Sequence, residues 1–98
     1  MNSPHLDPAT HGTKFGKITV TVDLDLGDCI IIAPGKGLVG QEVPSSKRFN
    51  SLDEIAGAYR TQCQLAASAA DKHPNAQDMA NALKFAGRKL KDHQERKR

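Results

Sequence analysis

The chain has few of the residues that build large cores and reactive sites. It has no Trp, aromatic residues make up 4% of its 98 residues, and cysteine occurs twice. The core must therefore consist mainly of Val, Ile, Leu and Ala, and such a thin core favours self-association as a source of stability. A chain of this length also buries only about two thirds of its unfolded surface, which argues against a deep catalytic cleft. We expect one small domain and, as a further hypothesis, a homodimer.

The two cysteines, Cys29 and Cys63, fit neither a metal-binding nor a redox-active spacing. A pair of this kind is more often two buried thiols than a disulfide, which favours a reducing compartment. No apolar stretch approaches the roughly 18 residues of a membrane helix, and the N-terminus lacks a basic-then-apolar signal pattern. We therefore expect a cytoplasmic protein without a membrane partner.

Positive charge is concentrated at the C-terminal end. Residues 84–98 contain seven of the fourteen Lys and Arg residues but two of the eleven acids, a balance of +5 against −2 for residues 1–83. Such a split is typical of a folded body with an interaction end, because a charged pole attracts an anionic partner without changing the fold.

The pattern divides the chain into three parts. Residues 1–14 contain two prolines, two histidines and almost no apolar periodicity, so we expect a flexible N-terminal segment. Residues 15–91 are predicted to form the single domain, and residues 92–98 a basic tail without an apolar repeat that frays into solvent.

The domain begins with a strand signal. Apolar and polar residues alternate from Ile18 to Leu26, which indicates a half-buried strand. After Gly27, the apolar run from Cys29 to Ala33 is rich in β-branched residues and reads as the returning strand of a hairpin that stops at Pro34.

The register of this hairpin decides which isoleucines are exposed. A three-residue loop over residues 25–27 places Ile30 and Ile32 on the buried face and leaves Ile31 outside. A two-residue loop over residues 27–28 instead exposes Ile30 and Ile32 as an apolar patch with an acidic rim, which would serve as a binding or dimer surface. Burial of apolar area favours the first register.

Three further elements follow. Residues 38–43 predict a short third strand limited by Pro44, after a glycine-rich connection. Ser51 and Glu54 form a capping box before a helix that should reach about Ala70. Asn75 is a reasonable cap for a second helix. The predicted fold class is α+β, with an N-terminal antiparallel β-hairpin or three-stranded sheet followed by two α-helices.

The sequence contains partial matches to phosphate-binding, acid–base and metal-binding motifs, but none has the surrounding sequence that such a site needs. Gly35 to Gly40 matches G-x-G-x-x-G, but the sequence after Gly40 does not open a helix that could bind a phosphate. Asp23 and Asp25 share one strand face, where solvation of the sheet is the simpler role. The four histidines fall outside metal-ligand spacings. We therefore expect a non-enzymatic protein without a metal or cofactor; the histidines are His5, His11, His73 and His93.

Two functional interpretations remain. The first is a regulator or inhibitor that binds another protein, with Ile31 and Phe85 as exposed apolar anchors. The second is nucleic-acid binding through the basic C-terminal helix and tail, although the recognition patterns of known nucleic-acid modules are missing. The residues proposed for this alternative are Lys84, Arg88, Lys89, Lys91, Arg96, Lys97 and Arg98.

No motif in the chain carries a resemblance to a particular family. The predicted order of hairpin, short strand, capped helix and basic helix is shared by many small antitoxins, phage-encoded inhibitors and transcriptional regulators. This is an analogy of architecture alone, and it favours a regulatory or antagonist role without transferring any residue.

Overall fold

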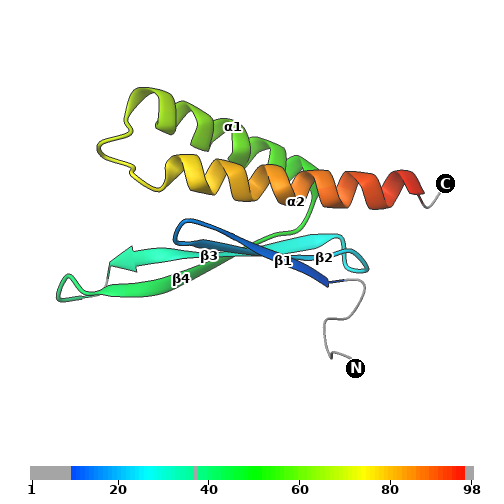
Figure 1. Cartoon of the computed structure of the whole chain (residues 1–98), viewed down its shortest axis with the longest axis horizontal. Helices are drawn as coiled ribbons and strands as arrows, with labels where there is room; N and C mark the ends of the chain where they lie inside the picture. The colour runs from blue at the N-terminus through cyan, green and yellow to red at the C-terminus, as the bar shows by residue number, and fades with distance from the viewer. Residues whose placement is uncertain (1–9, 37, 97–98) are drawn as a thin grey trace.

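A computed structural model describes residues 10–36 and 38–96 of the chain. Four strands form one antiparallel sheet in the order β1-β2-β3-β4, and two helices follow on one side of it (Figure 1). The α+β prediction is confirmed, with four strands instead of two or three. The strands are β1 Thr10–Phe15, β2 Ile18–Asp23, β3 Asp28–Lys36 and β4 Glu42–Phe49, and the helices are α1 Leu52–Ser68 and α2 Ala76–Arg96.

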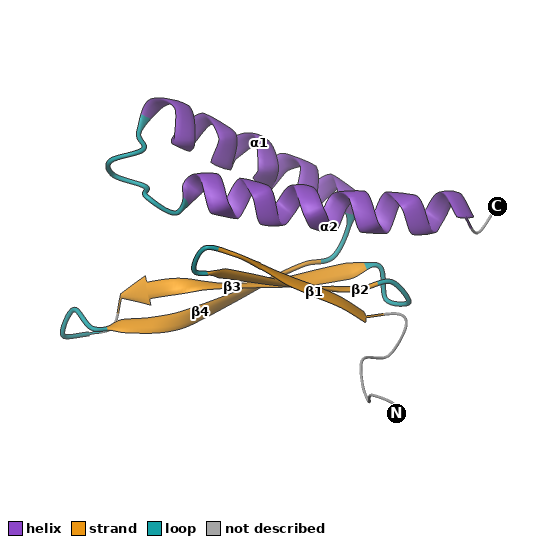
Figure 2. Cartoon of the chain, viewed as in Figure 1, coloured by secondary structure: helices purple, strands orange, loops and turns teal. Residues whose placement is uncertain are grey.

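The two helices cover the sheet unequally. Helix α2 lies against strands β1 to β3, whereas α1 packs mainly on α2 and meets the sheet at β4 (Figure 2). One residue of α1, Ile55, is buried, compared with six residues of α2. The core lies between α2 and the inner face of the sheet, and its main members are Ile18, Val20, Val22, Cys29, Ile31, Phe49, Ile55, Ala82, Leu83, Ala86 and Leu90.

Strand β1 occupies a segment that we expected to be flexible, so that prediction is wrong for residues 10–14. The strand pairs with β2 in a tight hairpin in which Phe15 lies opposite Ile18. Gly16 makes the turn with a positive φ of 59°, and a side chain there would collide with the Asp78 carboxylate of α2. The sequence Phe15-Gly16-Lys17-Ile18 could have indicated this hairpin, because a two-residue loop that contains glycine is typical of a tight turn between two strands. Residues 1–9 of the predicted flexible segment lie outside the described residues.

Neither predicted register of the β2–β3 hairpin is correct. Asp23 pairs with Asp28 across a four-residue loop, and Val20 pairs with Ile31. The Asp23 carboxylate accepts hydrogen bonds of 3.0 Å from the amides of Asp25 and Leu26, which ends the strand at this residue. The side chain of Asp23 therefore sets a register that apolar alternation alone did not reveal.

The register reverses the favoured assignment of the isoleucines. Ile31 is 1% exposed and belongs to the core, so the prediction that it is an exposed anchor is wrong. Ile32 is 40% exposed and Ile30 is partly exposed on the uncovered face of the sheet. The consequence expected from the less favoured register, an outward-facing Ile30 and Ile32, is the one observed.

The prediction of a third strand over residues 38–43 is wrong for residues 38–41, which lie in the connection; β4 begins at Glu42 and does not stop at Pro44. It runs to Phe49 at the edge of the sheet, with Pro44 opposite Pro34. Pairing between β2 and β3 ends at Ile32, so Pro34 lies beyond the last partner in β2. Both prolines thus occupy edge positions, where a missing amide proton costs little.

The helix boundaries follow local chemistry closely. The hydroxyl of Ser51 accepts a hydrogen bond from the Glu54 amide at 3.2 Å, as the capping box predicts. The Glu54 carboxylate accepts in turn from the Asn50 amide at 3.0 Å, one residue before the cap. Helix α1 ends at Ser68, two residues before the expected end, and α2 begins directly after Asn75.

Helix α2 continues to Arg96, so the expected fraying from residue 92 is wrong for residues 92–96. Arg96 lies in its last turn, where its positive charge interacts favourably with the helix dipole. Lys97 and Arg98 lie outside the described residues.

The observed register makes a prediction about stability. Ile31→Ala should lower the free energy of unfolding by about 2–5 kcal/mol, because it removes a fully buried side chain and leaves a cavity. Ile32→Ala is the matched control on the next residue and should cost about 1 kcal/mol or less, because that side chain is already in contact with water. Urea denaturation followed by circular dichroism measures both values. Equal losses would contradict the register.

Candidate interaction surfaces

No described residue covers the face of the sheet opposite the helices. Ile30 and Ile32 lie near its centre, paired with Arg48 and Ser46 of β4. At one end of this face, Arg48 donates a 2.8 Å hydrogen bond to the Asp28 carboxylate, which is 9% exposed. An apolar centre with charged and polar residues around it is the usual composition of a protein-binding surface.

Strands β3 and β4 extend past the end of β2 as a projecting arm. Pairing between them continues from Ala33 and Ser45 to Lys36 and Glu42. We call the segment of residues 33–43, without Gly37, the β3–β4 arm, and its tip projects beyond the body of the molecule (Figure 1).

The arm carries most of the exposed large apolar side chains of the described chain. Leu38 is fully exposed at the tip, Val39 is 84% exposed, and Val43 is 38% exposed on the returning strand. With Ile32 at the base, the hairpin holds four of the five such residues; the fifth is Leu26 in the β2–β3 turn. Isolated exposed apolar residues are ordinary, but their concentration on one projecting element indicates a contact surface.

A shallow hollow of about 350 Å³ lies where the arm meets the β1–β2 turn. Ile32, Pro34 and Pro44 contribute apolar surface to it. On its rim, Lys17 and Glu42 form an ion pair with 3.5 Å between the charged atoms. Both side chains are about two thirds exposed, so the pair adds little stability but supplies polar groups of both signs beside the apolar surface.

The basic residues predicted for nucleic-acid binding are divided between two sides of α2. Lys84, Arg88 and Lys91 are exposed. Lys89 lies on another side, with its ammonium 5.6 Å from the centre of the Phe85 ring. Arg96 is exposed in the last turn. Lys84 and Arg88 line one hollow with Lys89 and another with Lys91, so the structure brings these four predicted residues together and leaves Arg96 apart.

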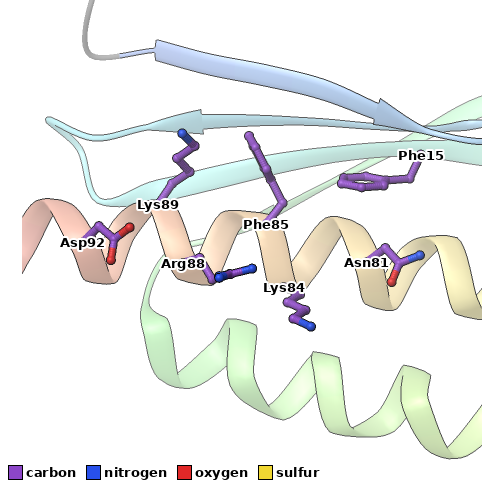
Figure 3. A pocket seen from close by; sticks show the side chains of 7 residues that line it. All are labelled: Phe15, Asn81, Lys84, Phe85, Arg88, Lys89 and Asp92. Atoms are coloured by element: carbon purple, nitrogen blue, oxygen red, sulfur yellow. The ribbon is translucent and has the colours of Figure 1, made fainter.

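Phe85 lies at the edge of the core, where it is half-buried against β1. Its ring meets that of Phe15 edge-on, with 6.1 Å between the ring centres. Figure 3 shows Phe85 and Lys89 on the sheet side of α2, and Lys84 pointing toward α1. A hollow of about 410 Å³ surrounds these side chains and also contains Asn81 and Asp92. The role of Phe85 in partner binding stays a prediction.

The two thiols lie in different environments. Cys29 is fully buried, and burial together with the neighbouring Asp28 carboxylate raises its pKa to about 11. Cys63 on α1 is only half-buried, contrary to the expectation that both thiols are buried. The structure describes no disulfide between them.

Within residues 10–36 and 38–96, no group of three or more His, Cys, Asp or Glu side chains is arranged to hold a metal ion. Neither described helix is long and apolar enough to cross a bilayer. No family model matches the chain, and comparison with curated proteins and with solved structures found no match.

The difference between the thiols is testable by alkylation. Iodoacetamide at pH 8 should modify Cys63 in the folded protein but leave Cys29 intact, because with a pKa near 11 about one Cys29 in a thousand is a thiolate. Peptide mapping by mass spectrometry locates the adduct. Urea should expose Cys29 to the same reagent, and Cys63→Ser should abolish the native adduct. Equal native rates at the two sites would contradict the described burial.

Proposed function

We propose that this chain is a small non-enzymatic protein-binding module that acts as a regulator or inhibitor by docking its β3–β4 arm on another protein. The observation that carries the proposal is the pair of adjacent, exposed side chains Leu38 and Val39 at the tip of a projecting hairpin. Placing such side chains in water has a free-energy cost that a partner's apolar surface removes on binding.

The surroundings of the tip support docking by the whole arm. Val43 and Ile32 continue the apolar surface toward the sheet, and the Lys17–Glu42 ion pair provides a polar boundary. A hairpin also presents its tip at low entropic cost, because the β3–β4 pairing already fixes the backbone.

The arm also has features that oppose simple edge-to-edge aggregation. Pro44 lies within the edge strand β4, and Lys47 and Arg48 follow it with exposed side chains. Proline and positive charge on an edge strand hinder the addition of another strand. This favours recognition through side chains at the tip over extension of the sheet.

The test compares two exposed leucines at opposite ends of β3. Leu38→Asp should reduce partner binding at least about tenfold, since it places a charge at the centre of the contact. Leu26→Asp is the matched control, because Leu26 is 68% exposed in the β2–β3 turn, and it should change affinity less than about twofold. Tagged protein captures the partner from nuclease-treated lysate of the source organism, and calorimetry with the purified partner then measures both variants.

Three outcomes would contradict the proposal. Equal affinities of the two variants would remove the arm from the interface. Capture that occurs only from lysate without nuclease would instead support the nucleic-acid alternative through the exposed Lys84, Arg88 and Lys91 of α2. If the only captured protein is a second copy of the chain, with a sedimentation mass of two chains, the arm is a homodimer contact and not a site for a different protein.

A further inference from the structure

A groove runs along the seam between the two helices, on a different part of the molecule from the β3–β4 arm. It has a volume of about 430 Å³. Its floor is apolar and includes Leu52, Tyr59 and Leu83. Ala56 and Gly87 are the small residues that line it.

The groove exists because α1 is incompletely covered. Helix α1 carries a stripe of apolar and small residues, yet only Ile55 among them is buried. Gly87 adds no side chain to the seam at this point, where a side-chain carbon would make an ordinary contact of 3.6 Å with a methyl group of Ile55. The remaining apolar atoms of α1, among them those of Leu52 and Tyr59, therefore face the seam and stay partly accessible to water.

One wall of the groove is positively charged. Lys84, Arg88 and Lys91 recur at intervals of four and three residues along α2, which places them on one side of the helix. The described side chains form two ion pairs, and neither includes these three residues. Asp53 is the one acid that lines the groove, so its charge does not balance the wall.

This arrangement of an apolar floor beside an uncompensated positive wall has a definite complement. We infer that the α1–α2 groove binds an acidic amphipathic helix of a partner protein, with apolar side chains of that helix on the floor and its carboxylates against Lys84, Arg88 and Lys91. Two antiparallel helices offer a seam in which a third helix packs, and the opposite charges fix its orientation.

The geometry favours this occupant over nucleic acid. Phosphate backbones bind to extended basic surfaces. The cations that line this groove are limited to the three of its wall, because Lys89 lies at the neighbouring hollow beside Phe85 and Arg96 lies at the helix end. An apolar floor also contributes nothing to a phosphate but stabilises leucine-type side chains.

The test uses three synthetic 18-residue peptides on the full chain. The first has leucines at helical spacing with glutamates on its other faces, the second has the same composition with the leucines scrambled, and the third has lysine in place of glutamate. Calorimetry at low ionic strength should give a dissociation constant on the order of 100 μM for the first peptide and binding at least about tenfold weaker for the other two. Equal binding of the three peptides would overturn the inference.

Variants of the groove separate its two halves. Lys84→Glu/Arg88→Glu should weaken binding of the first peptide at least about tenfold, and Ala56→Gln should weaken it several-fold because it puts an amide on the apolar floor without changing charge. Lys72→Glu, in the exposed α1–α2 connection, is the charge control and should leave affinity unchanged. Circular dichroism checks that each variant is folded.

Two results would show that the groove binds a different occupant. If a single-stranded or duplex oligonucleotide displaces the peptide and binds equally well to Ala56→Gln, the wall is a nucleic-acid contact and the inference fails. If sedimentation shows that the chain forms a dimer and Lys84→Glu/Arg88→Glu dissociates it, the occupant is a second copy. Because Leu38→Asp leaves this groove intact, loss of arm-mediated capture and loss of peptide binding are independent results.

Discussion

The packing of α2 against the inner face of the sheet is the contact on which the rest of the structure depends. Ala82 and Ala86 are fully buried in this layer, and such small side chains let the helix lie close to the valines of β2. Leu83, Leu90 and Ile55 belong to the same buried cluster. With so few large residues in the core, dispersion contacts at this interface stabilise the domain only if the surfaces fit closely.

Because the core contains few large residues, apolar side chains remain accessible to water on two surfaces, the β3–β4 arm and the seam between α1 and α2. The sheet is covered on one face by α2 and on the other by no described residue, and the β3–β4 arm extends past both layers. Helix α1 is held mainly by α2, so part of its apolar stripe remains accessible along the seam. Both features follow from one constraint: among the described residues, a single helix is well buried, and it covers one face of the sheet.

The two proposed surfaces differ in physical character. The arm presents exposed aliphatic side chains on a hairpin and would enter a concave surface on its partner. The α1–α2 groove is itself concave and carries a positive wall, so it would receive a convex, acidic element. A small regulator that used both could hold one partner at two points, and the avidity of such binding depends on whether the partner spans the distance between them.

The local signals in the sequence were sufficient for elements whose stability is local. Alternation from Ile18 to Leu26 identified β2, although the strand ends at Asp23. The Ser51–Glu54 capping box placed the start of α1 to the residue. Strand β1 was missed because its inward positions, His11 and Thr13, are polar and its stability comes from pairing with β2. The predicted position of β4 was wrong because the prediction ended the strand at Pro44, whereas a proline on an edge strand leaves no needed amide unpaired.

The candidate surfaces were less accessible to sequence reasoning. Lys84, Arg88 and Lys91 could be placed on one side of a helix from spacing alone, but their position beside an apolar groove required the docking of α1. Exposure of Leu38 and Val39 depended on β3 and β4 continuing beyond their neighbour, which no pattern within the segment indicated.

By itself, the sequence determined the α+β class, the capped first helix, the second helix and the excess of positive charge on it, since each depends on residues close together in the chain. Only the tertiary structure decided which isoleucines are buried, that a fourth strand exists and that a groove forms between the helices. The physical reason is that strand register and helix contact are set by partners distant in sequence, and a shift of one residue in pairing reverses the face that every side chain occupies.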